Sequence, residues 1–377
     1  MNVVITELEV ASTYVSSRTT WRFLRLTASD GSTGLGELTS ADPAVLQAEL
    51  RALGPGLTGA DAAGDRAGIV AALHGRAVAE RDKTRRHTLA VLASGLDAAW
   101  ADLLARGAGV PLWQYLGGQA LGQVSVYANI NRGLWTRTPQ EFATRAAEAV
   151  AAGFTRVKCA PFDHLPLTGA DLREAGLERL AAVRDVIGPD IDLYVDAHAK
   201  LPLDETLRAL PTLERLRIDW LEDAVPLPRI DLLREVRAAT GLRLAGGEQA
   251  YTAADLLPAL DASVFDVVLL DVRYTGGFTA LGRLIGVVSE RGLPVTLHNP
   301  AGPVATAASL HATTLIPVPT VLEFAYGETS WRPVVLDPPE RVSEGRLSLP
   351  AAPGIGADMA EAFGGFGPVG EFAAHAR

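Results

Sequence analysis

Three acidic residues recur at equal intervals in the second half of the sequence. Asp196, Glu222 and Glu248 are separated by 26 residues in both steps, and each follows a short apolar run of the kind that forms a β-strand. Carboxylates that converge repel one another and raise each other's pKa unless a cation holds them. Ligation by oxygen alone suits a hard octahedral ion, so the interval predicts a Mg²⁺ site with these three residues as ligands.

Asp223 competes with Glu222 for a place in this metal site. Neighbouring strand residues point to opposite faces, so only one of the two can reach the ion. The equal interval favours Glu222, and we expect Asp223 to point away. A simpler explanation, that strand ends are polar because loops are polar, applies to any single residue but does not account for the interval.

An acid–base pair is predicted at two later strand ends. Asp271 and His298 close neighbouring strands, and a carboxylate that holds one imidazole nitrogen orients the ring and raises its basicity. His298 is therefore the candidate base, although two unrelated polar residues would give the same pattern. His198 lies two positions after Asp196, and residues i and i+2 of a strand face the same side, so we expect its side chain to face the metal.

Two more charged residues follow predicted strands. Lys158 ends a β-branched run, and an inward-facing Lys beside a metal could bind a substrate carboxylate or act as a second base. Extension of its ammonium group to solvent is the alternative. Glu323 ends the last predicted strand, and Cys159 is expected to point to the other face and pack. The remaining histidines are expected to be surface or packing residues: His74, His87, His164, His311 and His375.

The elements that must position these residues repeat along the chain. From residue 123 to 339, short apolar runs alternate with amphipathic stretches such as PQEFATRAAEAVAAG. Eight strands with helical crossovers predict an α/β fold of the (β/α)₈ TIM-barrel type, whose reactive groups gather at the carboxyl ends of the strands. An open doubly wound sheet is the rival, but no G-x-G-x-x-G follows the first strand. The predicted strands are 124–128, 155–159, 191–196, 217–222, 242–248, 265–271, 293–298 and 320–324.

Residues 1–122 follow a different pattern. Alternating runs such as VVITELEVAS predict an antiparallel meander, and HTLAVLASGLDAAWADLLARGAG predicts a long helix whose small residues suit tight packing. This part is expected to form an α+β capping domain on the barrel of residues 123–339. The Gly/Pro-rich segment 340–377, with one weak helical stretch ADMAEAFGGFG, is expected to fold back onto the capping domain.

Composition limits the functions open to the 377-residue chain. A formal net charge of −10 argues against nucleic-acid binding, which needs Lys and Arg to neutralise phosphates. One cysteine allows no intrachain disulfide, no apolar stretch is long enough to span a membrane, and Glu7 and Glu9 stand where a signal peptide would be apolar. These totals leave a cytoplasmic enzyme or binding protein, and we expect a homo-oligomer with neither nucleic-acid nor membrane partners and with a small-molecule carboxylate as its substrate or ligand.

Together these residues resemble the enolase superfamily, and within it the mandelate racemase-like subgroup. The segments similar to that family's signatures are GLGEL (34–38), SGLDAAWADLLARGAGVPLWQYLGG (94–118) and HNPAGPVATAASLHA (298–312). The resemblance implies that the three carboxylates bind the metal, that Asp271 and His298 form the proton-transfer dyad, and that Glu323 is the acidic residue of the eighth strand.

Two departures from the subgroup bear on the reaction. Its racemases carry a Lys-x-Lys pair on the second strand, the later Lys acting as a base, whereas this chain has Lys158-Cys159-Ala160. The sequence Asp196-x-His198 resembles the subgroup's acid-sugar dehydratases, in which such a His protonates the departing hydroxyl. Both departures favour dehydration of a sugar acid over racemisation.

The resemblance therefore implies a Mg²⁺-dependent sugar-acid dehydratase. His298, held by Asp271, would remove the proton α to the carboxylate, and the metal would stabilise the enediolate, with Lys158 and Glu323 as further charge partners. His198 would protonate the β-hydroxyl as it leaves, which gives a 2-keto-3-deoxy acid. The alternative is a racemase, epimerase or cycloisomerase of a hydroxy acid that uses His298 and Lys158. A non-catalytic binding protein is disfavoured by the intact set of residues.

A lid over the site is expected from the capping domain. Residues 13–21, TYVSSRTTW, connect two predicted strands there, and Tyr14 and Arg18 could reach substrate hydroxyls or exclude water. Four other side chains are candidates for choosing among sugars: Asn129, Asn131, Trp135 and Arg273.

Overall fold

The computed structural model describes residues 3–318 and 320–369. Eight parallel strands form a closed barrel, because hydrogen-bonded neighbours run from β4 to β11 in chain order and β11 pairs back with β4. The predicted (β/α)₈ barrel is confirmed, and each predicted strand overlaps an observed one. The strands are β4 (Gln123–Asn129), β5 (Arg156–Cys159), β6 (Asp192–Asp196), β7 (Trp220–Glu222), β8 (Arg243–Gly246), β9 (Val267–Leu270), β10 (Val295–Leu297) and β11 (Leu322–Ala325).

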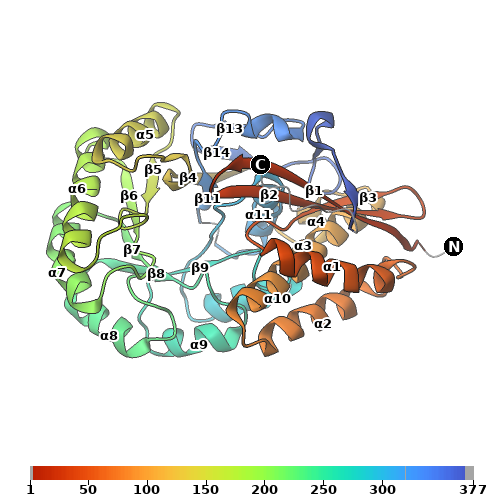
Figure 1. Ribbon diagram of the computed structural model, residues 1–377, viewed down its shortest axis with the longest axis horizontal. Coiled ribbons are helices and arrows are strands. Elements are labelled where there is room, and N and C mark those ends of the chain that lie inside the picture. The colour runs from red at the N-terminus through yellow and green to blue at the C-terminus, as the bar shows by residue number, and fades with distance from the viewer. Residues whose placement is uncertain (1–2, 319, 370–377) are drawn as a thin grey trace.

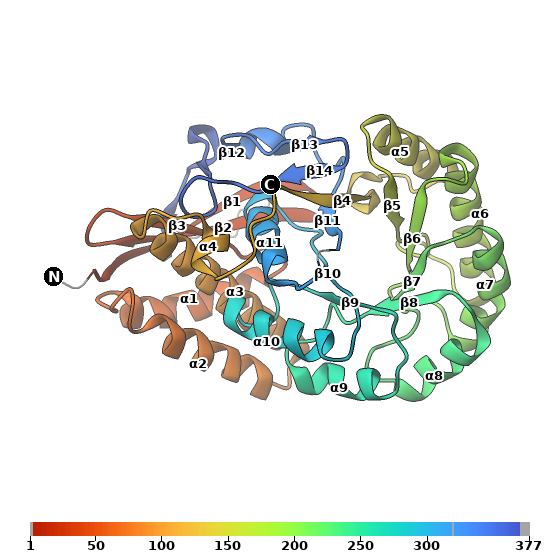
Figure 2. The same cartoon turned by 180° about the vertical axis from the view of Figure 1, so that it is seen from behind.

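Crossover helices cover the outside of the barrel (Figures 1 and 2). In α5, Phe142, Ala146 and Ala149 recur at helical spacing and are buried, while Thr138 caps the first turn by accepting a hydrogen bond from the Glu141 N–H. The helices are α5 (Pro139–Ala151), α6 (Gly169–Ile187), α7 (Leu203–Arg215), α8 (Ile230–Ala239), α9 (Ala253–Asp261), α10 (Phe278–Ser289) and α11 (Pro303–Ala312), with short 3₁₀ turns η1 (Asn131–Gly133) and η2 (Thr313–Leu315).

The N-terminal part packs against one side of the barrel (Figure 1). Its antiparallel sheet has the order β16-β1-β2-β3, which confirms the predicted meander. Its strands are β1 (Ile5–Ser16), β2 (Thr19–Ala28) and β3 (Thr33–Glu37), and its helices are α1 (Pro43–Leu57), α2 (Arg66–Ala79), α3 (Lys83–Gly107) and α4 (Leu112–Tyr115). The predicted long helix is α3, which is buried along most of its length because it touches both the cap sheet and the barrel.

Helix α3 is the one helix in the described ranges that is long and apolar enough to cross a membrane. However, 94% of its apolar window is buried inside the protein. Its small residues and Leu side chains therefore face protein on all sides, as in the core helix of a globular fold.

The C-terminal segment contacts both parts of the molecule. Strand β14 pairs with barrel strand β4, whereas β16 pairs with β1 of the cap. The prediction of a helix in ADMAEAFGGFG is wrong, because this Gly-rich segment contains strand β15, a single 3₁₀ turn and the first residue of β16. The elements are η3 (Arg332–Val335), β12 (Leu336–Asp337), β13 (Val342–Ser343), β14 (Arg346–Ser348), β15 (Asp358–Met359), η4 (Glu361–Phe363) and β16 (Gly367–Pro368). The domain boundaries at residues 122 and 339 stay predictions.

Glycines let β3 lie directly on α3. A Cβ on Gly36 would lie 2.0 Å from the carbonyl oxygen of Gly95, and a Cβ on Gly95 would lie 2.8 Å from the carbonyl oxygen of Glu37. Backbone therefore contacts backbone here, and neither position has room for a side chain.

Replacing Gly36 by Ala should force the strand and the helix apart. We expect the free energy of unfolding to fall by about 1–3 kcal/mol or more, as for other overpacked sites. Urea unfolding followed by circular dichroism measures the change. The control is Gly75→Ala on exposed α2, where a Cβ meets open space and helix propensity should raise stability by about 0.5–1 kcal/mol. Equal stability of the Gly36→Ala variant and the parent would contradict the close packing.

Two side chains join the cap to helix α11, which follows barrel strand β10. Glu37 at the end of β3 accepts hydrogen bonds from the N–H groups of Gly302 at 2.7 Å and Ala305 at 2.8 Å, and so caps the first turn of α11. On the same helix, the buried His311 accepts a hydrogen bond at Nδ1 from the Trp113 N–H of α4.

Stability should depend on pH through His311. Burial lowers its pKa to about 4, below the 6.5 of a free imidazole, so between these values the unfolded chain binds the proton more tightly. The free energy of unfolding should therefore fall as pH falls from 6.5 to 4, by up to about 1.4 kcal/mol per pH unit from this residue. Urea unfolding across that range should show a smaller slope for His311→Asn, whose amide oxygen replaces Nδ1. An unchanged slope would contradict a neutral His311 in the folded protein.

Candidate active site

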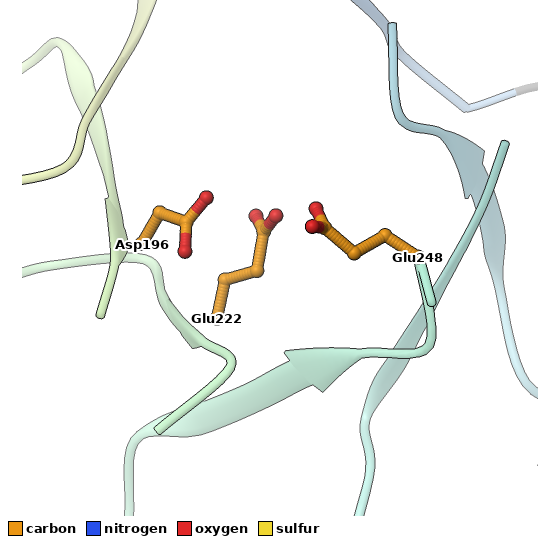
Figure 3. A group of neighbouring side chains, drawn as sticks. All are labelled: Asp196, Glu222 and Glu248. Atoms are coloured by element: carbon orange, nitrogen blue, oxygen red, sulfur yellow. The ribbon is translucent and has the colours of Figure 1, made fainter. Parts of the chain in front are cut away.

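Three neighbouring barrel strands bring three carboxylates together (Figure 3). Asp196 and Glu222 end β6 and β7 and are paired in the parallel ladder, and Glu248 lies two residues beyond β8. One oxygen of each side chain lies within 4.8 Å of the other two, and all three residues are buried. Such a set of buried oxygen donors fits a hard cation such as Mg²⁺.

Backbone turns, and not strand alternation, place the residues that follow these strands. Gly247 has a φ of 112°, and a Cβ there would lie 3.1 Å from the carbonyl oxygen of Leu269, so glycine allows the chain to turn Glu248 inward. Asp223 has a φ of 43°, and burial together with the charges of Glu248 and Asp196 raises its pKa well above the ordinary value. Glu222 and not Asp223 belongs to the group of possible metal ligands, as expected, but Asp223 lies beyond the end of β7, so a turn and not strand alternation sets its direction.

Lys158 lies within the acidic cluster. Its Nζ atom is 2.5 Å from Glu222 Oε1, 3.1 Å from Asp196 Oδ2 and 3.4 Å from Glu323 Oε1, and its side chain is fully buried. Burial alone would lower the pKa of Lys158, but these carboxylates outweigh burial and raise it well above its usual value. The ammonium group is enclosed by carboxylates and does not extend to solvent.

Asp271 and His298 form a hydrogen-bonded pair with Nδ1 and Oδ2 2.7 Å apart. The other ring nitrogen, Nε2, lies 2.8 Å from Glu248 Oε2, so the ring is directed at the acidic cluster. Arg273 holds Asp271 in turn, donating from its backbone N–H and from Nε to Oδ1 at 2.7 and 3.0 Å. Burial would lower the pKa of His298, but Glu248 and Glu323 raise it to about 10.

His198 bridges two carboxylates. Its Nε2 lies 3.0 Å from Asp196 Oδ2, and its Nδ1 lies 2.9 Å from Asp163 Oδ2. Burial would lower its pKa, but Asp196 and Asp163 raise it to about 11. With an acceptor at each ring nitrogen, the ring is held as an imidazolium, which can donate a proton. His198 thus lies beside Asp196 as expected, but a turn with a φ of 44° puts it there and not strand alternation.

Glu323 links the eighth strand to both of its neighbours. One oxygen accepts a hydrogen bond from the side-chain amide of Asn129 on β4, and the other accepts one from the Asn299 N–H beyond β10, at 2.9 Å. Cys159 is buried in the hydrophobic core, and burial raises the pKa of its thiol to about 12, which fits the expected packing role.

A cavity of about 350 Å³ brings both histidines to one surface at this end of the barrel. Its walls come from the β1–β2 turn of the cap and from the ends of β4, β5, β6 and β10. The lining residues are Arg18, Asn129, Asn131, Arg132, Arg137, Asp163, His164, Asp196, His198, His298 and Pro300.

The expected lid is a hairpin, because β1 and β2 extend over most of residues 13–21 and leave a two-residue turn. Arg18 in that turn reaches the cavity, whereas Tyr14 is exposed on β1 and is not a lining residue. Trp135 is also exposed, and its ring lies under the Arg18 guanidinium. Arg273 does not line the cavity either, since its side chain is used to hold Asp271.

Sequence reasoning missed five lining residues, of which one is the apolar Pro300 beyond β10. Arg132, Arg137 and Asp163 lie in the loops after β4 and β5, and the polar run that contains Asn131 was the available signal for the first two. His164, expected to be a surface or packing residue, is exposed at the cavity wall, while His375 lies outside the described residues.

Two family models match most of the chain. The model described as "Mandelate racemase / muconate lactonizing enzyme, N-terminal domain" matches residues 3–117, and the model described as "Enolase C-terminal domain-like" matches residues 141–363. The second match alone covers more than half of the chain, and its range holds the predicted metal ligands and the residues predicted to transfer protons.

Named relatives are similar over much of the chain. A D-gluconate dehydratase from Thermoproteus tenax is 32% identical over 74% of this chain, which spans only 56% of that protein. A D-galactonate dehydratase from Verminephrobacter eiseniae is 25% identical over 91% of this chain and 89% of its own length. A D-galactarolactone cycloisomerase from Agrobacterium fabrum is 27% identical over 74% of each. The crystal structure of a mandelate racemase/muconate lactonizing enzyme-like protein from Rubrobacter xylanophilus superposes with a TM-score of 0.84 at 25% identity, covering 96% of each chain.

Proposed function

This chain belongs to the mandelate racemase / muconate lactonizing enzyme family, and we propose that it is a Mg²⁺-dependent hydro-lyase that removes water from a sugar acid. The observation that carries the proposal is the pair of imidazoles that reach one cavity from opposite walls. His198 follows β6 and His298 follows β10, which are four positions apart in the eight-stranded ring. A substrate between them can lose a proton on one side and a hydroxyl group on the other.

The substrate carboxylate is assigned to the metal end of the cavity, with Asp196, Glu222 and Glu248 as the residues that hold the ion. When bound, Mg²⁺ supplies Lewis-acid stabilisation of negative charge that develops on the substrate. Lys158 and Glu323 lie next to these ligands and are assigned to charge balance and orientation, because the ammonium group contacts both Asp196 and Glu323.

His298 is assigned as the base. Asp271 accepts a hydrogen bond from Nδ1 and fixes the ring, so Nε2 is the nitrogen assigned to take the proton from the carbon α to the carboxylate. Glu248 contacts Nε2 and favours its protonated form, and a cation that held Glu248 would release this nitrogen to act as the base. His198 is assigned as the acid, since it is held between Asp163 and Asp196 and gives its proton to the β-hydroxyl as the C–O bond breaks. Water leaves, and the resulting enol tautomerises to a 2-keto-3-deoxy acid.

Racemisation is less well supported because it needs a second base. Lys158 is the candidate for that base, but it is enclosed by three carboxylates and is not among the residues that line the cavity. A cycloisomerase would use the same base and acid on a substrate whose leaving oxygen belongs to its own ring. The similarity to a cycloisomerase therefore makes sugar lactones a necessary part of any substrate screen.

Metal binding is tested by thermal unfolding with Mg²⁺ and with EDTA. Mg²⁺ at 100 times its Kd should stabilise the parent by about 2.7 kcal/mol. Glu222→Gln should lose most of that response, because it removes one charged ligand from the cluster. The control is Glu235→Gln on the exposed side of α8, which should respond like the parent. A parent that does not respond to Mg²⁺, or a Glu222→Gln variant that responds equally, would contradict the metal site.

The two histidines are tested by screening mono- and diacid sugars and their lactones in D₂O with Mg²⁺. Keto-acid trapping measures dehydration, and mass spectrometry measures deuterium at the α-carbon. His298→Asn should lose about 10²- to 10⁴-fold in both signals, whereas His198→Asn should lose keto-acid formation by a similar factor and keep exchange.

His74→Asn on α2 is the matched control for these variants and should behave like the parent. Deuterium exchange without keto acid in the parent would indicate a racemase. Keto-acid formation that survives in His198→Asn would remove the assigned acid.

A further inference from the structure

Three guanidinium groups line the cavity without a carboxylate partner. They belong to Arg18, Arg132 and Arg137, and within the described part of the chain none of them forms an ion pair. Arg18 donates to the Leu134 carbonyl, and Arg132 donates to Thr19 Oγ1 at 3.2 Å. A guanidinium group has five N–H donors on three nitrogens, so each of these two side chains keeps most of its donors free for another acceptor.

Arg137 is the most deeply placed of the three, with 4% of the residue exposed. Its terminal nitrogens donate to the carbonyls of Asn131 and Ala160, while its Nε has no hydrogen-bond partner among the described residues. Burial lowers its pKa to about 10, and the nearby charge of Asp163 offsets only part of that effect. The two hydrogen bonds to backbone carbonyls explain where the Arg137 side chain lies. They do not explain why a charged group is buried without an ion-pair partner.

Neither carboxylate of the cavity wall forms an ion pair with these arginines, although Asp163 Oδ1 has no hydrogen-bond partner among the described residues. Asp163 pairs with His198 through Oδ2, and Asp196 contacts both His198 and Lys158. Asp163 is close enough to Arg137 to raise its pKa, but it does not pair with it. The cavity wall therefore holds two carboxylates that contact His198 and three arginines that form no ion pair among the described residues.

The positions in the ring show which end of a substrate meets these arginines. Arg132 and Arg137 follow β4, which lies directly across the ring from β8, the strand that precedes Glu248. The two histidines stand two strands to either side of β4. A substrate with its carboxylate at the metal end and its reacting carbons between the histidines would extend toward the arginines.

We propose that the far end of the substrate carries a second negative group, so that the preferred substrate is a sugar diacid and not a monoacid. The inference rests on the proposed function, since it takes the first carboxylate to bind at the metal end. Arg binds carboxylates and phosphates through paired hydrogen bonds, and an anion placed here would supply the missing counter-charge. A sugar-acid phosphate ester offers the same anionic chemistry, and the test separates it from the diacid.

Binding is measured first, in the His298→Asn variant with Mg²⁺, so that turnover does not interfere. Isothermal titration compares a six-carbon sugar diacid, the monoacid of the same configuration and that monoacid's 6-phosphate. We expect the diacid to bind about 10- to 100-fold more tightly than the monoacid. A tighter 6-phosphate would support the distal anion and identify it as a phosphate, whereas equal binding of the monoacid would overturn the proposal.

The arginines are tested by Arg132→Gln and Arg137→Gln in the same background. Each should reduce the ratio of diacid to monoacid affinity by about 10-fold, while the monoacid measures any general damage to the site. Arg18→Gln provides a third variant if loss of the buried Arg137 prevents folding. The control is Arg291→Gln, an exposed residue after α10 that pairs with Asp261 and should leave the ratio unchanged.

Failure of the inference and failure of the proposed function give different results. If keto acid forms but monoacids are preferred and the arginine variants keep the parent's ratio, the distal-anion site is wrong and the dehydratase stands. If the diacid binds through the arginines but no sugar acid yields keto acid, the binding site stands and the dehydratase is wrong.

Discussion

Burial of like charges at one end of the barrel is the constraint on which the site depends. Carboxylates converge there from successive strands, and each would be driven to take up a proton unless a cation lay beside it. Lys158, His198 and His298 each lie between two or more of these carboxylates, and Arg273 holds the one that orients His298. The carboxylates still outnumber these cations, so a divalent ion held by Asp196, Glu222 and Glu248, as proposed, would complete the charge balance. The residues that could take part in a reaction are therefore also the ones that stabilise the buried carboxylates of the barrel.

The parallel barrel brings acidic residues that recur at a regular sequence interval close together in space. One acidic residue after each of three successive strands produces a cluster because neighbouring strands end at the same rim. The part of the rim formed by β6, β7 and β8 holds the proposed metal ligands, whereas the loop after β4 and the cap turn hold the arginines. Reaction and choice of substrate are thus assigned to opposite sides of one cavity.

The equal spacing of Asp196, Glu222 and Glu248 was enough to predict the cluster and the barrel, since both follow from a strand–helix period. Residues beyond the strand ends were harder to predict, because left-handed turns at His198 and Asp223 replace the alternation that holds inside a strand. Asp163 could not be predicted from the sequence, because its contact with His198 joins two separate loops and produces no periodic sequence pattern.

Glu37 shows how far the two parts of the chain depend on each other. Its carboxylate belongs to the cap, yet it holds the start of the helix that follows His298 and Asn299. A barrel inherited or expressed without its cap would leave two buried N–H groups without acceptors next to the segment that carries the imidazole. Recombination between relatives should therefore exchange cap and barrel as one unit, and a shuffled cap should be tolerated only if it brings an equivalent carboxylate to the end of its third strand.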